Sequence, residues 1–260
     1  VAIKVITLKF TDNIEEYRTE LNKIRTEKNI LSIVQHPNIL QLFGSNIPND
    51  VDITELESKD SRESQFHIVT ELCDGDSKQR IKDIFQHPPS NYEEIYLDYL
   101  LQIAYGMIYL HRIGIVHLDI KPENVFYKTI YYNSGNATYQ YKIGDFGVSV
   151  FKKTIEGEKF QLTSGTKNFK APEIWNGDAE TKYLEKCDVY SYGIMAYIFA
   201  SKKLSSKIYE GINEGFGGFV LGKKIVNENL RPAIDKCDEK KPIYTLITKC
   251  WHEDPIERPS

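Results

Sequence analysis

Four short segments rich in charged side chains stand in a fixed order along the chain. They are V-A-I-K at residues 1–4, H-L-D-I-K-P-E-N at residues 117–124, D-F-G at residues 145–147 and A-P-E at residues 171–173. A tripeptide such as D-F-G often arises by chance, whereas four segments in this order with these gaps do not. Their lysines can hold anionic oxygens, and their carboxylates and amide can hold a hard cation. The segments therefore favour chemistry on phosphate groups, which depends on positioning and charge neutralisation.

The ordered set resembles the eukaryotic protein kinase catalytic domain, and the resemblance covers nearly the whole chain. It implies an enzyme that uses ATP and Mg²⁺. Lys4 is then expected to hold the α- and β-phosphates, Asp119 to accept the proton of the substrate hydroxyl, and Lys121 to lie near the transferred phosphate. Asn124 and Asp145 are expected to bind Mg²⁺.

The family's lysine pairs with a carboxylate on a helix, and Glu27 matches that carboxylate. It lies nine residues before His36, where the family's H-P-N segment follows the helix. Helical spacing alone does not select Glu27, because Lys28 falls in the same broad arc. A carboxylate that faces inward needs a cation, since an unpaired buried charge is very costly. The alternative is an ordinary surface glutamate.

The resemblance also implies contacts to the nucleoside of ATP. Thr70 matches the residue at the back of the adenine pocket, and the residues from Glu71 to Cys73 match the hinge whose backbone bonds the adenine. Asp76 matches the ribose contact. A plain turn aspartate is an equally good interpretation of Asp76.

Other matches imply structural roles. The matching positions are Leu31, Leu42, His117 and Phe146 for an apolar spine linking two lobes, and Asp188, Glu173 and Arg258 for buried ions. We expect His117 to pack in the spine rather than to shuttle protons, and Arg258 to pair with Glu173.

The sequence departs from the family pattern in three places. The middle residue of the family's H-R-D is Leu118. The family's glycine-rich loop precedes V-A-I-K, so we expect that loop to lie before Val1 and the chain to be excised from a longer protein. The span from Asp119 to Asp145 has room for a tyrosine-rich hairpin, which is either an edge elaboration or a docking surface.

Two further patterns resemble functional motifs. Residues 211–222 are glycine-rich, but Val220 breaks the G-x-G-x-x-G spacing, so we expect a connection between helices. Asn136-Ala137-Thr138 is a glycosylation sequon, which we expect to stay unused in a reducing compartment.

Composition excludes several classes of protein. Of 260 residues 41% are apolar and 27% are charged, enough for one large core or two small lobes. Lys plus Arg number 33 and Asp plus Glu 37, a net charge of −4, which argues against nucleic acid or an anionic membrane as a partner. The uncharged stretches are too short to cross a bilayer. Four scattered cysteines indicate free thiols and a cytoplasmic, reducing setting; they are Cys73, Cys187, Cys237 and Cys250.

Periodicity predicts the elements that must position these residues. We expect a strand at residues 1–8, a helix after residue 12, strands at 39–43 and 66–72, a long helix opened by a capping box at Ser90, and a hairpin within 124–144. The fold class is α+β with two lobes. Residues 1–73 are predicted to form a small, sheet-rich, truncated N-lobe with the hinge, and residues 74–260 a larger helical C-lobe truncated near its last helix.

These expectations lead to phosphoryl transfer from ATP to Ser/Thr hydroxyls of protein substrates. Lys121 and Gly165-Thr166 resemble the Ser/Thr type, and the ending C-W-H-E-D-P-I-E-R-P is similar to the tyrosine-kinase-like group. The alternative is a catalytically silent, kinase-like regulatory or binding module, which the retained Lys4, Asp119 and Asp145 argue against. A small-molecule kinase is a third alternative, disfavoured by A-P-E and Gly165-Thr166.

Overall fold

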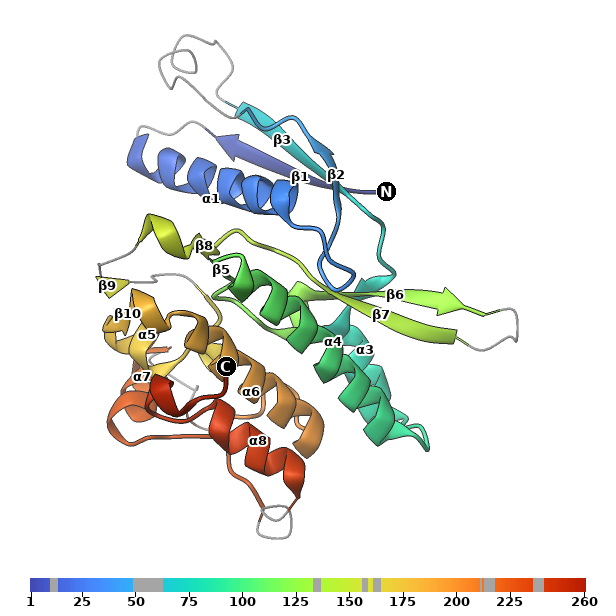
Figure 1. Cartoon of the computed structure of the whole chain (residues 1–260), viewed down its shortest axis with the longest axis vertical. Helices are drawn as coiled ribbons and strands as arrows, with labels where there is room; N and C mark the ends of the chain where they lie inside the picture. The colour runs from blue at the N-terminus through green and yellow to red at the C-terminus, as the bar shows by residue number, and fades with distance from the viewer. Residues whose placement is uncertain are drawn as a thin grey trace.

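The chain folds into a sheet-rich part and a larger, mainly helical part (Figure 1). The computed structural model describes residues 1–9, 14–48, 63–132, 137–155, 159–160, 165–210, 212, 218–235 and 241–260. The predicted α+β, two-lobed architecture is confirmed, and the boundary after residue 73 stays a prediction. Within the described ranges, no helix has the length and apolar character needed to cross a membrane.

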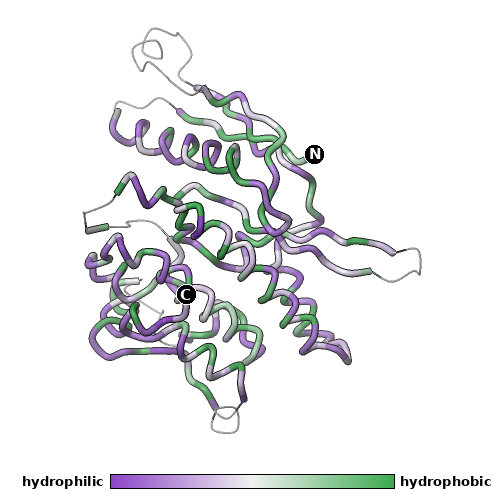
Figure 2. Tube along the Cα trace, in the orientation of Figure 1, coloured by the Kyte–Doolittle hydropathy of each residue, from purple (hydrophilic) through white to green (hydrophobic). Residues whose placement is uncertain are grey.

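One helix and three strands build the sheet-rich part: β1 (Ala2–Lys9), α1 (Ile14–Ile33), β2 (Leu42–Ser45) and β3 (Glu63–Thr70). The strands are antiparallel in the order β1-β3-β2. The helix α1 lies along this sheet (Figure 1) and buries Tyr17, Leu21, Ile24 and Leu31, as the apolar spacing predicts. Hydrophobic and hydrophilic residues alternate along these elements (Figure 2), as expected for elements with one buried face.

The helical part is built from α3 (Ser77–Gln86), α4 (Tyr92–Arg112), α5 (Pro172–Asn176), α6 (Glu185–Ser201), α7 (Gly218–Asn227) and α8 (Pro242–Cys250). Helix α6 is buried along most of its length and contacts α4 and α8. It therefore forms the centre of the core of this part.

The predicted capping box at Ser90 is wrong. Helix α4 begins at Tyr92, and its N-cap is Asn91, whose side chain makes no capping hydrogen bond. Tyr92 is buried and its hydroxyl donates to the Phe199 carbonyl at 2.6 Å. A tertiary contact therefore accompanies the start of this helix in place of a local cap.

Short strands and 3-10 turns complete the fold. The strands are β4 (Gly75–Asp76), β5 (Ile115–Val116), β6 (Val125–Tyr131), β7 (Ala137–Ile143), β8 (Val150–Phe151), β9 (Lys159–Phe160) and β10 (Ala179–Glu180). The turns are η1 (Pro122–Asn124), η2 (Lys152–Thr154), η3 (Lys167–Phe169), η4 (Thr181–Tyr183) and η5 (Pro255–Glu257).

The hairpin predicted within residues 124–144 is confirmed as β6 and β7, which project from the body of the molecule (Figure 1). Arg80 of α3 lies against its base, 3.3 Å from the centre of the Tyr139 ring, and donates to the Tyr141 hydroxyl at 3.1 Å. The hairpin is thus anchored by packing on α3. The sequon at Asn136 lies outside the described residues, and the docking interpretation stays a prediction.

The glycine-rich stretch at residues 211–222 is not wholly a connection, because α7 begins at Gly218. A Cβ atom at Gly222 would lie 2.6 Å from the Trp175 ring, and one at Gly218 would lie 2.6 Å from the Lys167 side chain. Glycine at these positions lets α7 approach α5 closely. Residues 211 and 213–217 lie outside the described residues.

Candidate active site

A cavity of about 550 Å³ lies between the sheet-rich and helical parts. It is lined by residues from both parts, including every residue that the sequence assigns to ATP or metal binding: Lys4, Glu27, Thr70, Glu71, Cys73, Asp76, Asn124 and Asp145. Asp119 and Lys121 are outside this lining, but Asp119 Oδ2 accepts hydrogen bonds from both Asn124 Nδ2 and Lys121 Nζ. The fold therefore brings all the predicted site residues to one region.

Lys4 and Glu27 form the predicted ion pair at the sheet side of the cavity. Lys4 Nζ lies 2.7 Å from Glu27 Oε2, 2.8 Å from Glu27 Oε1 and 3.5 Å from Asp145 Oδ1. Burial lowers the pKa of Lys4, but the two carboxylates outweigh burial and raise it above its ordinary value. Burial dominates for Glu27 and raises its pKa, against the opposing charge of Lys4. Lys4 thus stays a cation with two acidic neighbours.

Asp119 is the centre of a second group of polar side chains. Lys121 Nζ donates to Asp119 Oδ2 at 2.5 Å and to Thr166 Oγ1 at 2.7 Å, and the Thr166 backbone N–H donates to Asp119 Oδ1 at 3.1 Å. Burial raises the pKa of Asp119, but the hydrogen bond and charge of Lys121 outweigh it and hold the pKa below its ordinary value. Asp119 is therefore an ionised carboxylate held in place by three partners from two segments.

The donor set at Asn124 and Asp145 fits Mg²⁺. Asn124 Nδ2 donates to the Asp119 carbonyl at 2.8 Å and to Asp119 Oδ2 at 2.9 Å, which leaves the amide oxygen available as a ligand. Asp145 presents a carboxylate to the same cavity. One amide oxygen and one carboxylate, with substrate phosphates, match the few protein ligands that Mg²⁺ takes.

The segment from Thr70 to Cys73 lies at the hinge end of the cavity. The Glu71 side chain turns to Lys142 Nζ, 2.9 Å away, and accepts the Gln41 backbone N–H at 3.0 Å. Among the described residues, neither the N–H nor the C=O of Cys73 makes an intrachain hydrogen bond. The Cys73 backbone can therefore bond a flat heterocycle, and the Glu71–Lys142 pair, which sequence reasoning missed, holds the hinge.

The position of Asp76 is compatible with both of its alternative interpretations, the ribose contact and the turn aspartate. It lines the cavity, and its Oδ1 accepts the backbone N–H groups of Lys78 and Gln79 at 2.9 and 3.3 Å as the N-cap of α3. The capping role is observed, and a ribose contact remains a proposal.

Sequence reasoning missed the apolar walls of the cavity, formed by Ala2, Ile3, Leu40, Ile68 and Phe126. A Cβ atom at Gly144 would lie 2.8 Å from the Phe126 ring and 3.2 Å from the Leu40 side chain. Gly144 thus makes room for these walls, and a glycine directly before D-F-G is the signal in the sequence.

Buried contacts hold the loops beneath the cavity. The Phe146 ring is fully buried with its centre 5.0 Å from that of His117, and the His117 ring bonds the Gly144 carbonyl through Nε2 at 3.1 Å. Asp188 accepts the backbone N–H groups of His117 at 2.8 Å and Leu118 at 2.7 Å. These contacts agree with the predicted packing role of His117.

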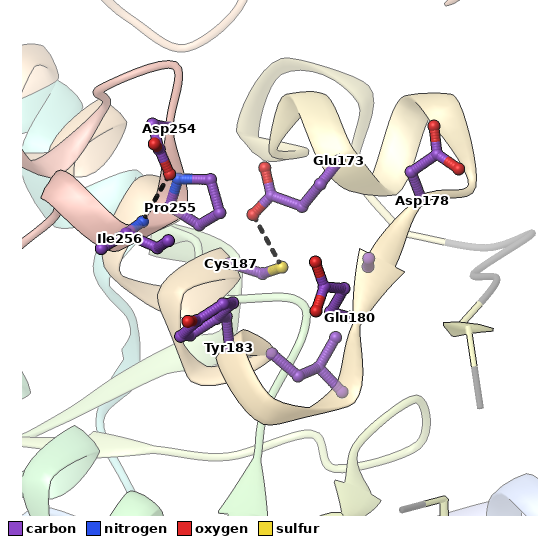
Figure 3. A pocket seen from close by; sticks show the side chains of 10 residues that line it. Glu173, Asp178, Glu180, Tyr183, Cys187, Asp254, Pro255 and Ile256 are labelled. Atoms are coloured by element: carbon purple, nitrogen blue, oxygen red, sulfur yellow. Dashed lines mark hydrogen bonds between the residues drawn. The ribbon is translucent and has the colours of Figure 1, made fainter. Parts of the chain in front are cut away.

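A smaller cavity of about 220 Å³ lies beside the A-P-E segment (Figure 3). Arg258 bonds both carboxylate oxygens of Glu173 at 2.6 and 2.8 Å, which confirms the predicted pair. Cys187 Sγ points at the same carboxylate from 3.1 Å (Figure 3). The Glu173 carboxylate thus has a structural role: its ion pair with Arg258 connects the A-P-E segment to the turn η5 and the residues after it.

A two-part α+β fold, with a lysine–glutamate pair above the cavity and an aspartate–lysine–threonine cluster beside it, defines the protein kinase class. A family model described as "Protein kinase domain" matches residues 1–260, and the chain belongs to this family.

Named relatives are consistent with this membership. The chain is 32% identical to the probable serine/threonine-protein kinase drkC of Dictyostelium discoideum, over 100% of this chain and 30% of the relative. It is 30% identical to the dual specificity protein kinase shkE of the same organism, over 93% and 30%, and 30% identical to a light-sensor protein kinase of Ceratodon purpureus, over 91% and 18%. The chain thus spans less than a third of the length of these relatives.

Proposed function

We propose that the chain transfers a phosphoryl group from ATP, with Mg²⁺, to Ser/Thr hydroxyls of protein substrates. The observation that carries the proposal is the Lys4 contact to both Glu27 and Asp145, at 2.7 and 3.5 Å, in the same cavity as Asn124. The family uses ATP and Mg²⁺, and the complete set of charged groups argues against a silent regulatory module.

Each side chain has a role that follows from its surroundings. Lys4 would bind the α- and β-phosphates, with Glu27 fixing its position. Asn124 and Asp145 would hold Mg²⁺, which neutralises charge on the phosphate oxygens when bound. Cys73 and Asp76 would bind the nucleoside.

The acceptor hydroxyl would meet Asp119 and Lys121. Asp119 is ionised and can accept the hydroxyl proton on its carboxylate, as the hydroxyl oxygen bonds to the γ-phosphorus of ATP and ADP leaves. Lys121 bonds Asp119 and can also bond the transferred phosphate, because its ammonium carries three donors.

Two observations support Ser or Thr as the acceptor. Lys121 Nζ and Thr166 Oγ1 belong to the two segments that resemble the Ser/Thr type, and they are bonded at 2.7 Å. The relative drkC is named a probable serine/threonine kinase, whereas shkE is named a dual specificity kinase. Because shkE is named a dual specificity kinase, tyrosine is the alternative acceptor that the experiment must distinguish from Ser and Thr.

We also infer a reducing, cytoplasmic setting. Cys73, Cys187 and Cys250 are free thiols, and Cys237 lies outside the described residues. Free thiols are typical of proteins kept in a reducing compartment, which supports the proposal.

The test is phosphate transfer by the full-length protein from γ-labelled ATP and Mg²⁺ to a random-peptide library, followed by phosphoamino-acid analysis. Label on phosphoserine and phosphothreonine that disappears in Asp119→Asn supports the proposal. A dominant phosphotyrosine signal would overturn the Ser/Thr assignment. ATP binding without transfer to any peptide would favour the silent module.

A further inference from the structure

A third cavity, of about 300 Å³, adjoins the candidate active site on the helical part. It shares Glu123 with the ATP cavity, and its wall includes Thr166, which is bonded to Asp119 and Lys121. The cavity and the Asp119 cluster are therefore neighbours, because Thr166 belongs to both. A polypeptide whose hydroxyl reaches Asp119 can place a neighbouring side chain in this cavity.

Two lysines of α3 line the cavity. Lys78 and Lys82 are one helical turn apart and so share a face of the helix. Lys82 is half-buried and makes no ion pair with any residue that the structure describes. Among the described residues, Lys82 is therefore the lysine of the cavity lining that has no acidic partner within the protein.

Glu123 contributes a carboxylate to the lining of this cavity, and this carboxylate is already paired with Lys78. Lys78 Nζ lies 2.9 Å from Glu123 Oε1, and the paired carboxylate raises the pKa of Lys78. Glu123 Oε2 is buried and has no hydrogen-bond partner. Because Lys78 neutralises Glu123, the charge left over in the cavity wall is that of Lys82.

Two more lysines lie close to Thr166. Lys167 is the next residue, and Lys170 is half-buried with its Nζ 4.9 Å from the centre of the Trp175 ring. Burial lowers the pKa of Lys170, against the opposing charge of Asp119. Both lysines add positive charge to the turn that follows Thr166, although neither lines the cavity.

We propose that this cavity binds an acidic side chain of the substrate, carboxylate or phosphate, close to the acceptor Ser or Thr. The inference rests on the proposed function and adds to it a class of substrate sequence. Lys82 is the main specificity residue, and Lys78 acts by cancelling the attraction of Glu123 for basic side chains. Anionic groups gain from a half-buried, unpaired ammonium, and cationic groups are disfavoured by the same charge.

Peptide scanning with the full-length protein tests the preference. Each position flanking the acceptor is filled in turn with Asp, phosphoserine, Ala or Lys. At one or more positions we expect the acidic peptides to exceed the Ala peptide in kcat/KM by about tenfold, mainly through KM, and the advantage to shrink at high salt. The Asp and phosphoserine arms distinguish a carboxylate from a prior phosphorylation. A flat scan or a preference for Lys overturns the proposal.

Variants identify the residues responsible. Lys82→Glu should remove the advantage in kcat/KM that the acidic peptides have over the Ala peptide. Lys78→Gln should raise kcat/KM on Lys peptides by about fivefold, because Glu123 loses its partner. The exposed Lys249→Glu on α8 changes the net charge equally and should leave the preference intact. An unchanged preference in Lys82→Glu would contradict the assignment.

A binding measurement separates this proposal from the proposed function. Fluorescence anisotropy of a labelled Asp peptide whose acceptor is Ala needs no catalysis. Weaker binding to Lys82→Glu than to the parent protein supports the cavity even if no peptide is phosphorylated. Equal binding together with normal phosphorylation of neutral peptides would overturn the cavity proposal and leave the kinase proposal standing.

Discussion

Asp188 holds Leu118 in a backbone conformation that leucine rarely adopts. Leu118 has φ of 65°, in the left-handed region, and donates its backbone N–H to Asp188 Oδ1 at 2.7 Å. Asp188 Oδ2 accepts from the His117 backbone at 2.8 Å and contacts His111 Nε2, also at 2.8 Å. One buried carboxylate thus fixes the backbone directly before Asp119.

Asp188→Asn should lower the free energy of unfolding by about 2–3 kcal/mol. The amide has one oxygen where the carboxylate has two, so a buried donor is left without an acceptor. Urea denaturation measures the loss, and Glu94→Gln on the exposed face of α4 is the charge-matched control, expected within about 0.5 kcal/mol. A loss equal to that of the control would show that Asp188 does not hold the loop.

Lys4→Met should lower phosphoryl transfer by about 10³-fold or more, equivalent to a barrier rise of about 4 kcal/mol. The side chain contacts Glu27 and Asp145 in the cavity and contributes little to the core, so the variant should fold. Asp145→Asn should have a similar effect. Lys9→Met on the same strand, where the lysine pairs with exposed Glu63, is the control and should keep the parent rate. Transfer within tenfold of the parent for Lys4→Met contradicts the assignment.

Lys121→Met should move the acid limb of the pH–rate profile to higher pH. Lys121 holds the pKa of Asp119 below its ordinary value, so removal of the ammonium lets that pKa rise. For stability, the lowered pKa means that the contribution of ionised Asp119 is present at neutral pH and lost as pH falls through the folded-state pKa. The rate at neutral pH should fall about 10²-fold. Exposed Lys203→Met is the control; an unmoved limb in Lys121→Met would show that Lys121 does not control Asp119.

Gly222→Ala should lower the free energy of unfolding by about 1–3 kcal/mol, because the added Cβ would lie 2.6 Å from the Trp175 ring. At Gly44 nothing lies within 4 Å of an added Cβ, so Gly44→Ala is the matched control and should lose less. Thermal or urea unfolding of both variants decides the point. If Gly222→Ala lowered the free energy of unfolding no more than Gly44→Ala does, α7 would be able to move away from Trp175 without cost.

Phosphorylation between Asp145 and Glu173 should change turnover by about fivefold or less. Leu118 is buried and offers no donor where the family has an arginine, and Lys152 is already bonded to Glu185 at 2.5 Å. A new phosphate would gain only the ~0–1 kcal/mol of a surface pair. The measurement is turnover of the full-length protein before and after phosphatase treatment, and with the possible acceptors Thr154, Thr163 and Ser164 changed to Ala. A loss beyond about 50-fold would show a phospho-switch; Thr163 and Ser164 lie outside the described residues.

The sequence predicted the parts of the site that sit in short motifs. Lys4 and Glu27 were paired from the family match, and the structure places them 2.7 Å apart. The Glu71–Lys142 pair could not be predicted in this way, because it joins residues 71 positions apart that belong to no common motif. Such pairs depend on how the hairpin packs under the hinge.

Local rules failed where distant contacts decide the structure. Ser90 has the capping spacing, yet α4 begins at Tyr92, which bonds Phe199 across the core. The glycine-rich composition at the start of α7 is typical of a loop. In the structure, Gly218 and Gly222 are helical, and their lack of a side chain makes room for the Trp175 ring. In both cases the deciding partner is far away in the sequence.

The Glu173–Arg258 pair has a consequence for synthesis, because 85 residues separate the two partners. At roughly 5–20 residues per second, a ribosome makes Arg258 about 4–17 s after Glu173. During that interval the carboxylate lacks its guanidinium, and the site beside α6 that Arg258 fills stays open. The A-P-E segment therefore cannot form its final contacts until Arg258 has been synthesised and has left the ribosome.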